Sequence, residues 1–307
     1  MTTSLADIYP LCFKGLRKVF DNYKDIPDVW KSIYKNVKQE LLIEYDQEMK
    51  GLGYADKLKE REGYSEDNFQ ALYKFPYEVE SWGKKFAVTE DAVMFNQYKN
   101  QFNMSASNAK QSLVNTKKAN SMKLFNNAFV GNLLPDGLPL CAVNRPVANG
   151  TYSNATAVGV ALTAAAVSDA IINIRKMKIA NGMLAGVKAQ HLLVSPPNQV
   201  KASVLLNSRL KTNVGTQAGG ENGMNDVNVI YTDSYVPKGV LVSDYLLSAT
   251  AWFLLTDAEQ GFSYRTYKDI MYNTWPDYNL RVMYNSAIER YVFGCGNPRA
   301  VYGSVGA

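Results

Sequence analysis

The sequence is poor in the residues on which most enzyme and metal chemistry depends. His191 is its only histidine, and the three cysteines, Cys12, Cys141 and Cys295, are odd in number and far apart. A lone histidine before a short apolar run is typical of a structural residue, so we predict neither a Ser-His-Asp nor a multi-histidine metal site. The cysteines form neither a disulfide framework nor a metal knuckle, which indicates a reducing compartment.

Several longer signals are also missing. No stretch reaches the roughly 18 apolar residues of a membrane span, and no basic-then-apolar signal peptide opens the chain. Neither GxSxG nor GxGxxG occurs. The closest match to a phosphate loop, Gly182–Lys188, has the wrong spacing, and Ala189 replaces the hydroxyl that would hold magnesium. We therefore predict a cytoplasmic protein, not an enzyme, with no catalytic, cofactor-binding or metal-binding residue.

The composition is that of a globular protein. Of the 307 residues, 47% are hydrophobic and 20% are charged, and the net charge is +5. This length is ample for one large domain or two modest ones. The mild basic excess permits weak attraction to a polyanion but does not predict sequence-specific nucleic-acid binding.

The first third of the chain contains elements that do not bury their own apolar side chains. Residues 1–50 combine aromatic and aliphatic anchors with lysines, and we expect two short amphipathic helices joined by a bend. They lie either on the rest of the fold or on a neighbouring subunit. Residues 54–87 are rich in charge and include an alternating tract over 73–81, which predicts one strand of a long hairpin. Because an isolated hairpin is marginal in water, it needs support.

A long helix follows, for which Thr89 is the expected N-cap. Glu90 and Asp91 suit its first turn, and apolar residues recur at spacings of three and four toward Phe129. A helix of about 40 residues would span roughly 60 Å, longer than a compact domain needs.

The remainder mixes helices and strands without regular βαβ alternation, which favours an α+β fold. Thr163 caps a second helix that ends at Asn181-Gly182, a third helix carries Val200 and Val204, and residues 215–228 are a loop. Strands are predicted at 192–194, 227–231, 240–242, 252–255 and 280–293.

The order of several short phrases resembles the major capsid proteins of tailed bacteriophages, the Hong Kong 97-type fold. These phrases contain packing and turn residues and no catalytic group. They are Glu62-Gly63-Tyr64, Ala87-Val88-Thr89-Glu90-Asp91, Phe125–Phe129, Asp136–Leu140, Gly150–Ala155, Leu192–Pro197, Leu205–Ser208, Ala251–Leu255 and Tyr302–Gly306.

The resemblance implies an assignment of the parts. Residues 1–50 would be an N-terminal arm and 51–87 an extended hairpin loop. A peripheral domain with a long spine helix would comprise 88–150 and 262–307, and an axial domain 151–261. Trp30, Tyr34, Phe75 and Tyr77 would be subunit contacts, buried mainly by other subunits or across a subunit boundary.

The resemblance further implies a structural protein of the virion. Subunits would assemble in the host cytoplasm as hexamers and pentamers of an icosahedral shell around double-stranded DNA. The partners would be copies of the chain itself, a separate scaffolding protein, a portal, possibly cement or decoration proteins, and packaged DNA held non-specifically. No membrane or cofactor would be involved.

Two other readings stay open: an encapsulin-type nanocompartment shell, which shares the fold, and a soluble α+β enzyme. Two expectations concern the mature shell. We expect no covalent crosslink between subunits, because no suitably placed carboxylate is evident beside Lys57 or Lys59. We also expect no trimming, because the arm-like pattern begins at Leu5-Ala6-Asp7-Ile8.

Overall fold

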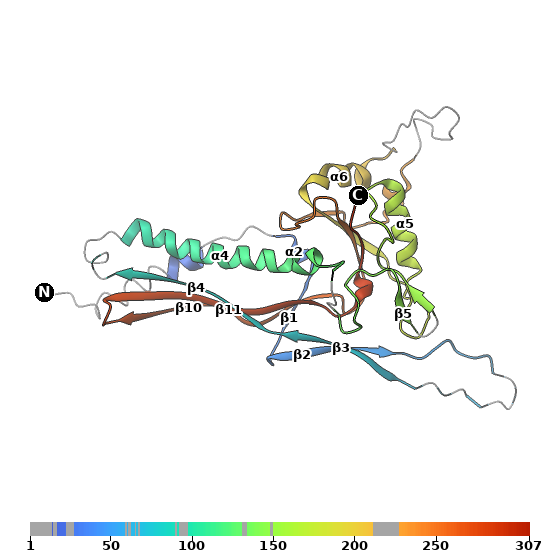
Figure 1. The fold of residues 1–307 in the computed structure, drawn as a ribbon, viewed down its shortest axis with the longest axis horizontal. Helices are drawn as coiled ribbons and strands as arrows, with labels where there is room; N and C mark the ends of the chain where they lie inside the picture. The colour runs from blue at the N-terminus through green and yellow to red at the C-terminus, as the bar shows by residue number, and fades with distance from the viewer. Residues whose placement is uncertain are drawn as a thin grey trace.

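The fold has three parts, which are called below the first body, the second body and the hairpin. In the computed structural model (Figure 1), a long sheet lies under one long helix, a smaller sheet is surrounded by short helices, and a two-stranded hairpin runs along the underside. The structure describes residues 14, 17–22, 28–58, 60, 63, 64, 66, 68–89, 91, 98–130, 134–147, 150–210 and 227–307.

The first body is built on a four-stranded sheet in the order β1-β10-β11-β4. Its strands are β1 (Lys35–Lys38), β10 (Phe262–Asp277), β11 (Val282–Cys295) and β4 (Glu80–Thr89). β10 and β11 form a long antiparallel hairpin, β4 joins the far edge of β11 antiparallel, and β1 runs parallel to β10. Three segments that lie far apart in the sequence thus form one elongated sheet.

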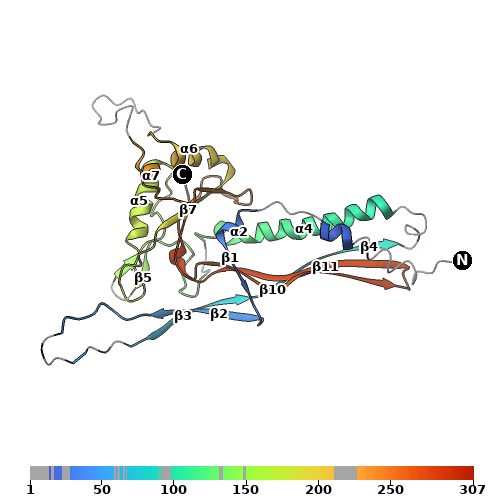
Figure 2. The ribbon, with the colours of Figure 1, turned by 180° about the vertical axis from the view of Figure 1, so that it is seen from behind.

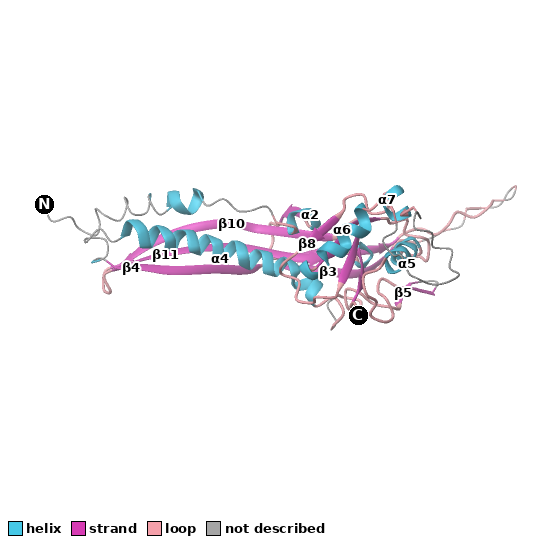
Figure 3. Cartoon of the chain, turned by 90° about the horizontal axis from the view of Figure 1, so that it is seen from above, coloured by secondary structure: helices cyan, strands magenta, loops and turns pink. Residues whose placement is uncertain are grey.

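Helix α4 (Tyr98–Asn126) covers one face of this sheet along its length, as Figure 3 shows. Ala106 and Leu113 of α4 pack on Met283 and Ala287 of β11, together with Phe20 from the helical residues 17–22. Further along, Lys117 of α4 forms a 2.6 Å ion pair with Glu289, whose side chain is 2% exposed. Burial lowers the pKa of Lys117, but the charges of Glu289 and Tyr264 and the hydrogen bonds to both residues together raise that pKa above its usual value.

The second body is a smaller sheet in the order β12-β9-β7-β8. Its strands are β7 (Ala189–Val194), β8 (Val240–Val242), β9 (Trp252–Thr256) and β12 (Val301–Ser304). Around them lie α5 (Ala164–Arg175), η1 (Pro196–Asn198), α6 (Gln199–Asn207) and α7 (Val229–Thr232). Thr163 caps α5 as predicted, because its side chain accepts a 3.2 Å hydrogen bond from the Ala166 amide.

Four smaller units complete the described fold. Helix α2 (Trp30–Ile33) leads into β1, and the strands β5 (Arg145–Val147) and β6 (Gly150–Tyr152) pair with each other. Strand β2 (Ile43–Lys50) pairs antiparallel with β3 (Gln70–Glu78) to form the hairpin. Helix η2 (Pro298–Ala300) joins the long sheet to β12. Side chains from α4, β9 and β10 share one apolar cluster, so the two bodies pack directly on each other.

The α+β class is confirmed, as are the three short strands at 192–194, 240–242 and 252–255 and the strand through 280–293. The strand predicted over 73–81 is divided, because β3 ends at Glu78 and pairs with β2, whereas Glu80 and Ser81 begin β4 in the long sheet. Four local predictions are wrong. Residues 35–50 contain β1 and β2 instead of a helix, and the segment predicted as a strand over 227–231 contains α7. Helix α5 ends at Arg175, before Asn181-Gly182, and α4 ends at Asn126.

The domain limits drawn from the sequence also need revision at three points. The hairpin begins at Ile43, inside the segment predicted as an arm, and β4 lies in the long sheet although most of it falls within 51–87. Thr89, the predicted helix cap, is the last residue of β4, and Glu90 lies outside the described residues. β12 pairs with β9 and so belongs to the second body. The predicted loop over 215–228 lies largely outside the described residues, which resume at Val227.

The Lys117–Glu289 pair makes a testable prediction about stability. Replacing Lys117 with Met leaves the Glu289 carboxylate buried without its partner, and we expect the free energy of unfolding of the unassembled subunit to fall by about 3 kcal/mol in urea denaturation. The double variant Lys117→Met/Glu289→Leu should recover most of this loss. The control Lys123→Met, at an exposed position of the same helix, should change stability little. If Lys117→Met and the control Lys123→Met lowered the free energy of unfolding by the same amount, the prediction would be contradicted.

Candidate subunit interface

The root of the hairpin is held on the first body by ion pairs. Glu44, Asp46 and Glu48 are at alternate positions of β2 and therefore point to one side of the strand. The Arg265 guanidinium of β10 contacts Glu44 at 3.0 Å and Asp46 at 2.5 Å. It also lies 3.8 Å from the centroid of the Tyr77 ring of β3. Burial disfavours the charge of Arg265, but its hydrogen bond to Asp46 and the charges of Asp46, Tyr77 and Glu44 together raise its pKa.

A second arginine ties the hairpin to the second body. Arg299 of η2 forms a 2.8 Å ion pair with Glu48, and its Nε donates a 2.7 Å hydrogen bond to the Lys178 carbonyl, beyond the end of α5. Its guanidinium lies 5.2 Å from the centroid of the Tyr152 ring. The Arg299 side chain is 7% exposed. The direction in which the hairpin leaves the molecule is thus fixed by groups from both bodies.

Two glycines allow the hairpin root to approach this closely. A Cβ on Gly294 would overlap the Tyr77 ring, and a Cβ on Gly296 would lie 2.9 Å from an Asp46 oxygen. The side chain of Gln39, 1% exposed, adds a 2.9 Å hydrogen bond from Nε2 to the Tyr77 carbonyl. The root is therefore a close-packed joint with defined partners.

The opposite side of β2 is apolar and exposed. Ile43, Tyr45 and Met49 are 37%, 58% and 58% exposed, and they alternate with the three paired carboxylates. The usual polarity of a surface strand is therefore inverted, with charges toward the protein and apolar groups toward solvent. Further exposed apolar side chains continue along the hairpin and its connections: Leu41, Leu42, Leu52, Tyr54, Leu58, Tyr64, Phe69 and Tyr73. An exposed apolar strand side of this kind is typical of an interaction surface.

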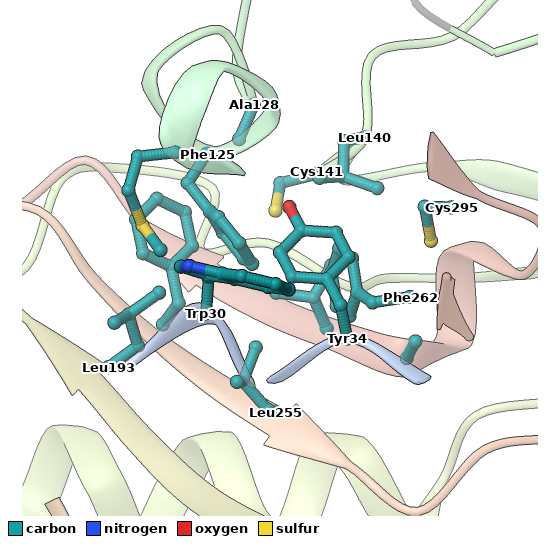
Figure 4. Close-up of a cluster of buried hydrophobic side chains, with 14 of the residues drawn as sticks. Trp30, Tyr34, Phe125, Ala128, Leu140, Cys141, Leu193, Leu255, Phe262 and Cys295 are labelled. Carbon is teal, nitrogen blue, oxygen red and sulfur yellow. The ribbon is translucent and has the colours of Figure 1, made fainter. Parts of the chain in front are cut away.

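The four predicted contact residues lie elsewhere. Trp30, Tyr34, Phe75 and Tyr77 are 9%, 4%, 3% and 1% exposed within a single chain. Figure 4 shows Trp30 and Tyr34 from the α2 segment inside one cluster with Phe125 of α4 and Phe262 of β10. The expectation that neighbouring subunits supply most of their burial is therefore wrong, because these side chains attach α2 and β3 to their own chain.

Aromatic packing explains this outcome. The Trp30 ring lies 4.9 Å from that of Tyr264, and the Tyr34 ring lies 4.8 Å from that of Phe293, in the edge and tilted arrangements that aromatic pairs prefer. The Tyr34 hydroxyl donates a 2.5 Å hydrogen bond to the Ser121 carbonyl. Burial raises the pKa of Tyr34.

The exposed residues of β2 were missed although the sequence contains their signal. The segment Ile43-Glu44-Tyr45-Asp46-Gln47-Glu48-Met49-Lys50 alternates apolar and acidic residues with period two, which predicts a strand. The helix-like spacing of the anchors before it obscured this pattern.

The groups considered for chemistry form no catalytic arrangement among the described residues. His191 lines a cavity of about 670 Å³ between the two sheets, and burial with the nearby Lys238 lowers its pKa. Its Nδ1 has no hydrogen-bond partner. Cys141 and Cys295 are free and buried, while Cys12 lies outside the described residues. In the part of the chain that the structure describes, no cluster of His, Cys, Asp and Glu suits a metal ion, and no helix has the length and apolar character to cross a membrane.

Comparison with known families decides the relationship. The model of a family described as phage capsid protein matches residues 73–304, which include α4, the smaller sheet, every strand of the long sheet except β1, and most of β3. The chain belongs to this phage capsid family. A search of curated protein sequences gave no significant match.

Solved structures place this capsid protein in the Hong Kong 97-type fold. The capsid of cyanophage P-SCSP1u is similar with a TM-score of 0.55 and 11% identity, over 90% of this chain and 86% of that one. The virus-like particle from Pyrococcus furiosus has a TM-score of 0.54 and 11% identity, over 95% and 98%. An encapsulin complex from Synechococcus elongatus has a TM-score of 0.54 and 11% identity, over 93% and 91%. At these identities, the similarity shows the fold alone.

The ion pairs at the root of the hairpin lead to a prediction about hydrogen exchange in β2. Replacing Arg265 with Met removes two charge-assisted hydrogen bonds, each of which contributes about 1.5 to 3 kcal/mol. We expect amide hydrogens of β2 in the capsid subunit to exchange at least about tenfold faster, since each 1.4 kcal/mol is a factor of ten. The control Arg290→Met removes an exposed arginine of β11. Unchanged exchange in β2 would show that the ion pairs do not hold the hairpin.

The glycines predict a steric effect at the same joint. Gly294→Ala places a methyl group inside the volume of the Tyr77 ring, so Tyr77 must move or β11 must shift. We expect a loss of about 2 kcal/mol of subunit stability, measured by urea unfolding. Gly63→Ala is the matched control, because a Cβ there meets nothing within 4 Å. The same stability for both variants would contradict this account.

Proposed function

We propose that this chain is the major capsid subunit of a tailed bacteriophage and that its copies assemble as hexamers and pentamers of an icosahedral shell around double-stranded DNA. The match to the phage capsid family supports this proposal. The inverted polarity of β2 supports self-association in particular, because the exposed apolar side of the hairpin requires a covering surface outside its own chain. We propose no catalytic role and no cofactor.

A second copy of the same chain is the occupant that fits the hairpin. The hairpin runs along the underside of the molecule (Figures 1 and 2), and the side of β2 that carries the exposed Ile43, Tyr45 and Met49 is open to a neighbour. The far end of β10–β11 also exposes apolar side chains, with Trp275 at 42% and Tyr278 at 66%. A subunit that presents apolar surface at two separated places suits an assembly in which each copy has several neighbours.

The further partners follow from the same proposal. Assembly in the host cytoplasm would use a separate scaffolding protein, and the finished shell would include a portal and, in some phages of this type, decoration proteins. Within the proposal, residues 88–150 with the long sheet would form the peripheral domain, and the second body would form the axial domain.

An encapsulin-type compartment is the second candidate, because two similar structures are a virus-like particle and an encapsulin complex. Electron microscopy of the particles, with nucleic-acid analysis of their contents, separates the candidates. DNA-filled heads are expected, whereas protein-filled shells would favour the compartment. A stable monomer at micromolar concentration under all salt conditions would exclude both.

The exposed side of β2 predicts a separation of assembly from folding. Tyr45→Ser/Met49→Ser removes apolar surface that is already in solvent, so the stability of the isolated subunit should change by less than about 0.5 kcal/mol. Shell formation, followed by light scattering and microscopy, should fall sharply. The control Tyr45→Phe/Met49→Leu keeps the apolar surface and should still assemble. Trp30→Ala should show the reverse behaviour, with a loss of about 3 to 5 kcal/mol of subunit stability. Normal shells from the double serine variant would show that β2 is not an interface.

A further inference from the structure

The basic charge of the chain is concentrated in one layer. We call the helix layer the set formed by Lys14, residues 17–22 and α4, which lie together on one side of the long sheet (Figure 3). The sequence of this layer contains eight lysine and arginine residues and one carboxylate, Asp21, a net charge of +7. The whole chain carries +5, so all remaining residues together carry a net charge of −2. Helix α4 itself contains no Asp or Glu.

Part of this charge faces solvent. Lys14, Lys18 and Lys123 are exposed, and Lys110 and Lys118 are half-buried. Lys117 is neutralised by Glu289, and Arg17 lies 3.7 Å from Asp21. Between the lysines, the outer side of α4 presents the carboxamides of Asn108, Gln111 and Asn115. Helix α4 has 29 residues and is therefore about 44 Å long, which gives an extended polar and basic surface.

We propose that the helix layer is the surface of the shell subunit that contacts duplex DNA through its phosphates. The inference rests on the proposed enclosure of DNA and names the face that meets it. Lysine and carboxamide side chains are the groups that contact phosphate and sugar oxygens without reading sequence. The charge excess of this layer has the sign that a polyanion requires.

The two faces of the long sheet differ in exposed apolar side chains, and this difference favours DNA over a protein as the partner of the helix layer. Within residues 104–126 of α4, Met104 is the one exposed large apolar side chain. A protein interface needs an apolar core, whereas a DNA interface is polar and positively charged. The other face of the sheet differs, since Trp275 alternates with Tyr272 and Thr274 on the helix side and so points away from α4. Trp275 is 42% exposed there, beside Tyr284 at 5.9 Å between ring centroids.

The test compares two pairs of lysines in the purified full chain. Lys18→Gln/Lys123→Gln removes two exposed charges from the helix layer, and the control Lys176→Gln/Lys201→Gln removes two exposed charges from the second body. Binding to a fluorescent 30-base-pair duplex is measured by anisotropy from 50 to 200 mM salt. Because each lost phosphate contact lowers the salt slope of log K by about 0.9, the first pair should lower it by about 1.8 and the control should leave it nearly unchanged.

Several outcomes would overturn the inference. These are equal losses from both pairs, no measurable binding of the duplex by the unmodified chain, or binding of poly-glutamate of matched charge as tight as binding of DNA. The last result would assign the face to an acidic protein. Microscopy of the same preparations keeps the two proposals apart. Shells that form while the duplex results fail would leave the capsid role intact, whereas absence of shells from the unmodified chain would count against the capsid role itself.

Discussion

The ion pairs between β2 and two buried arginines set the geometry on which the proposed assembly depends. Glu44 and Asp46 meet Arg265 of the long sheet, and Glu48 meets Arg299, which also binds the Lys178 carbonyl of the second body. Buried ion pairs contribute little net stability compared with apolar packing, but they have strict geometric requirements. At this root they select one direction for the hairpin, and they turn the carboxylates inward so that Ile43, Tyr45 and Met49 must face outward.

Elements whose signal is local could be predicted from the sequence. The Thr163 cap and the apolar stripe of α5 need only neighbouring residues, and Leu192-Leu193-Val194 before two prolines is a buried strand wherever it packs. The strand predicted through 280–293 corresponds to β11, in which buried and less buried residues alternate from Met283 to Tyr291. The family resemblance came from the order of many such local phrases and was confirmed by the match over residues 73–304.

Contacts between distant segments could not be predicted in the same way. The 16 residues of β10 contain polar runs such as Tyr267-Lys268-Asp269, and their register shifts twice against β11, so no clean alternation is present. Trp30 and Tyr34 carry the amphipathic pattern of an arm, but nothing within residues 28–34 shows that Phe293 and Ser121 are their partners. A side chain that lacks a local partner is equally compatible with burial by its own chain and with burial by a neighbour. Only the tertiary structure decides between them.

This distinction separates three kinds of surface in the subunit. Aromatic residues that pack between the two bodies, such as Phe125 and Phe262, are fully used within one chain, and changes there act on folding. Apolar residues on the outward side of β2 have no such partner in the described chain, and changes there act on association. The helix layer has little exposed apolar surface and an excess of lysine, which suits weak contact with a polyanion. A shell subunit needs all three surfaces to face different directions, and the long sheet achieves this by holding α4 on one face while the hairpin root is fixed at its end.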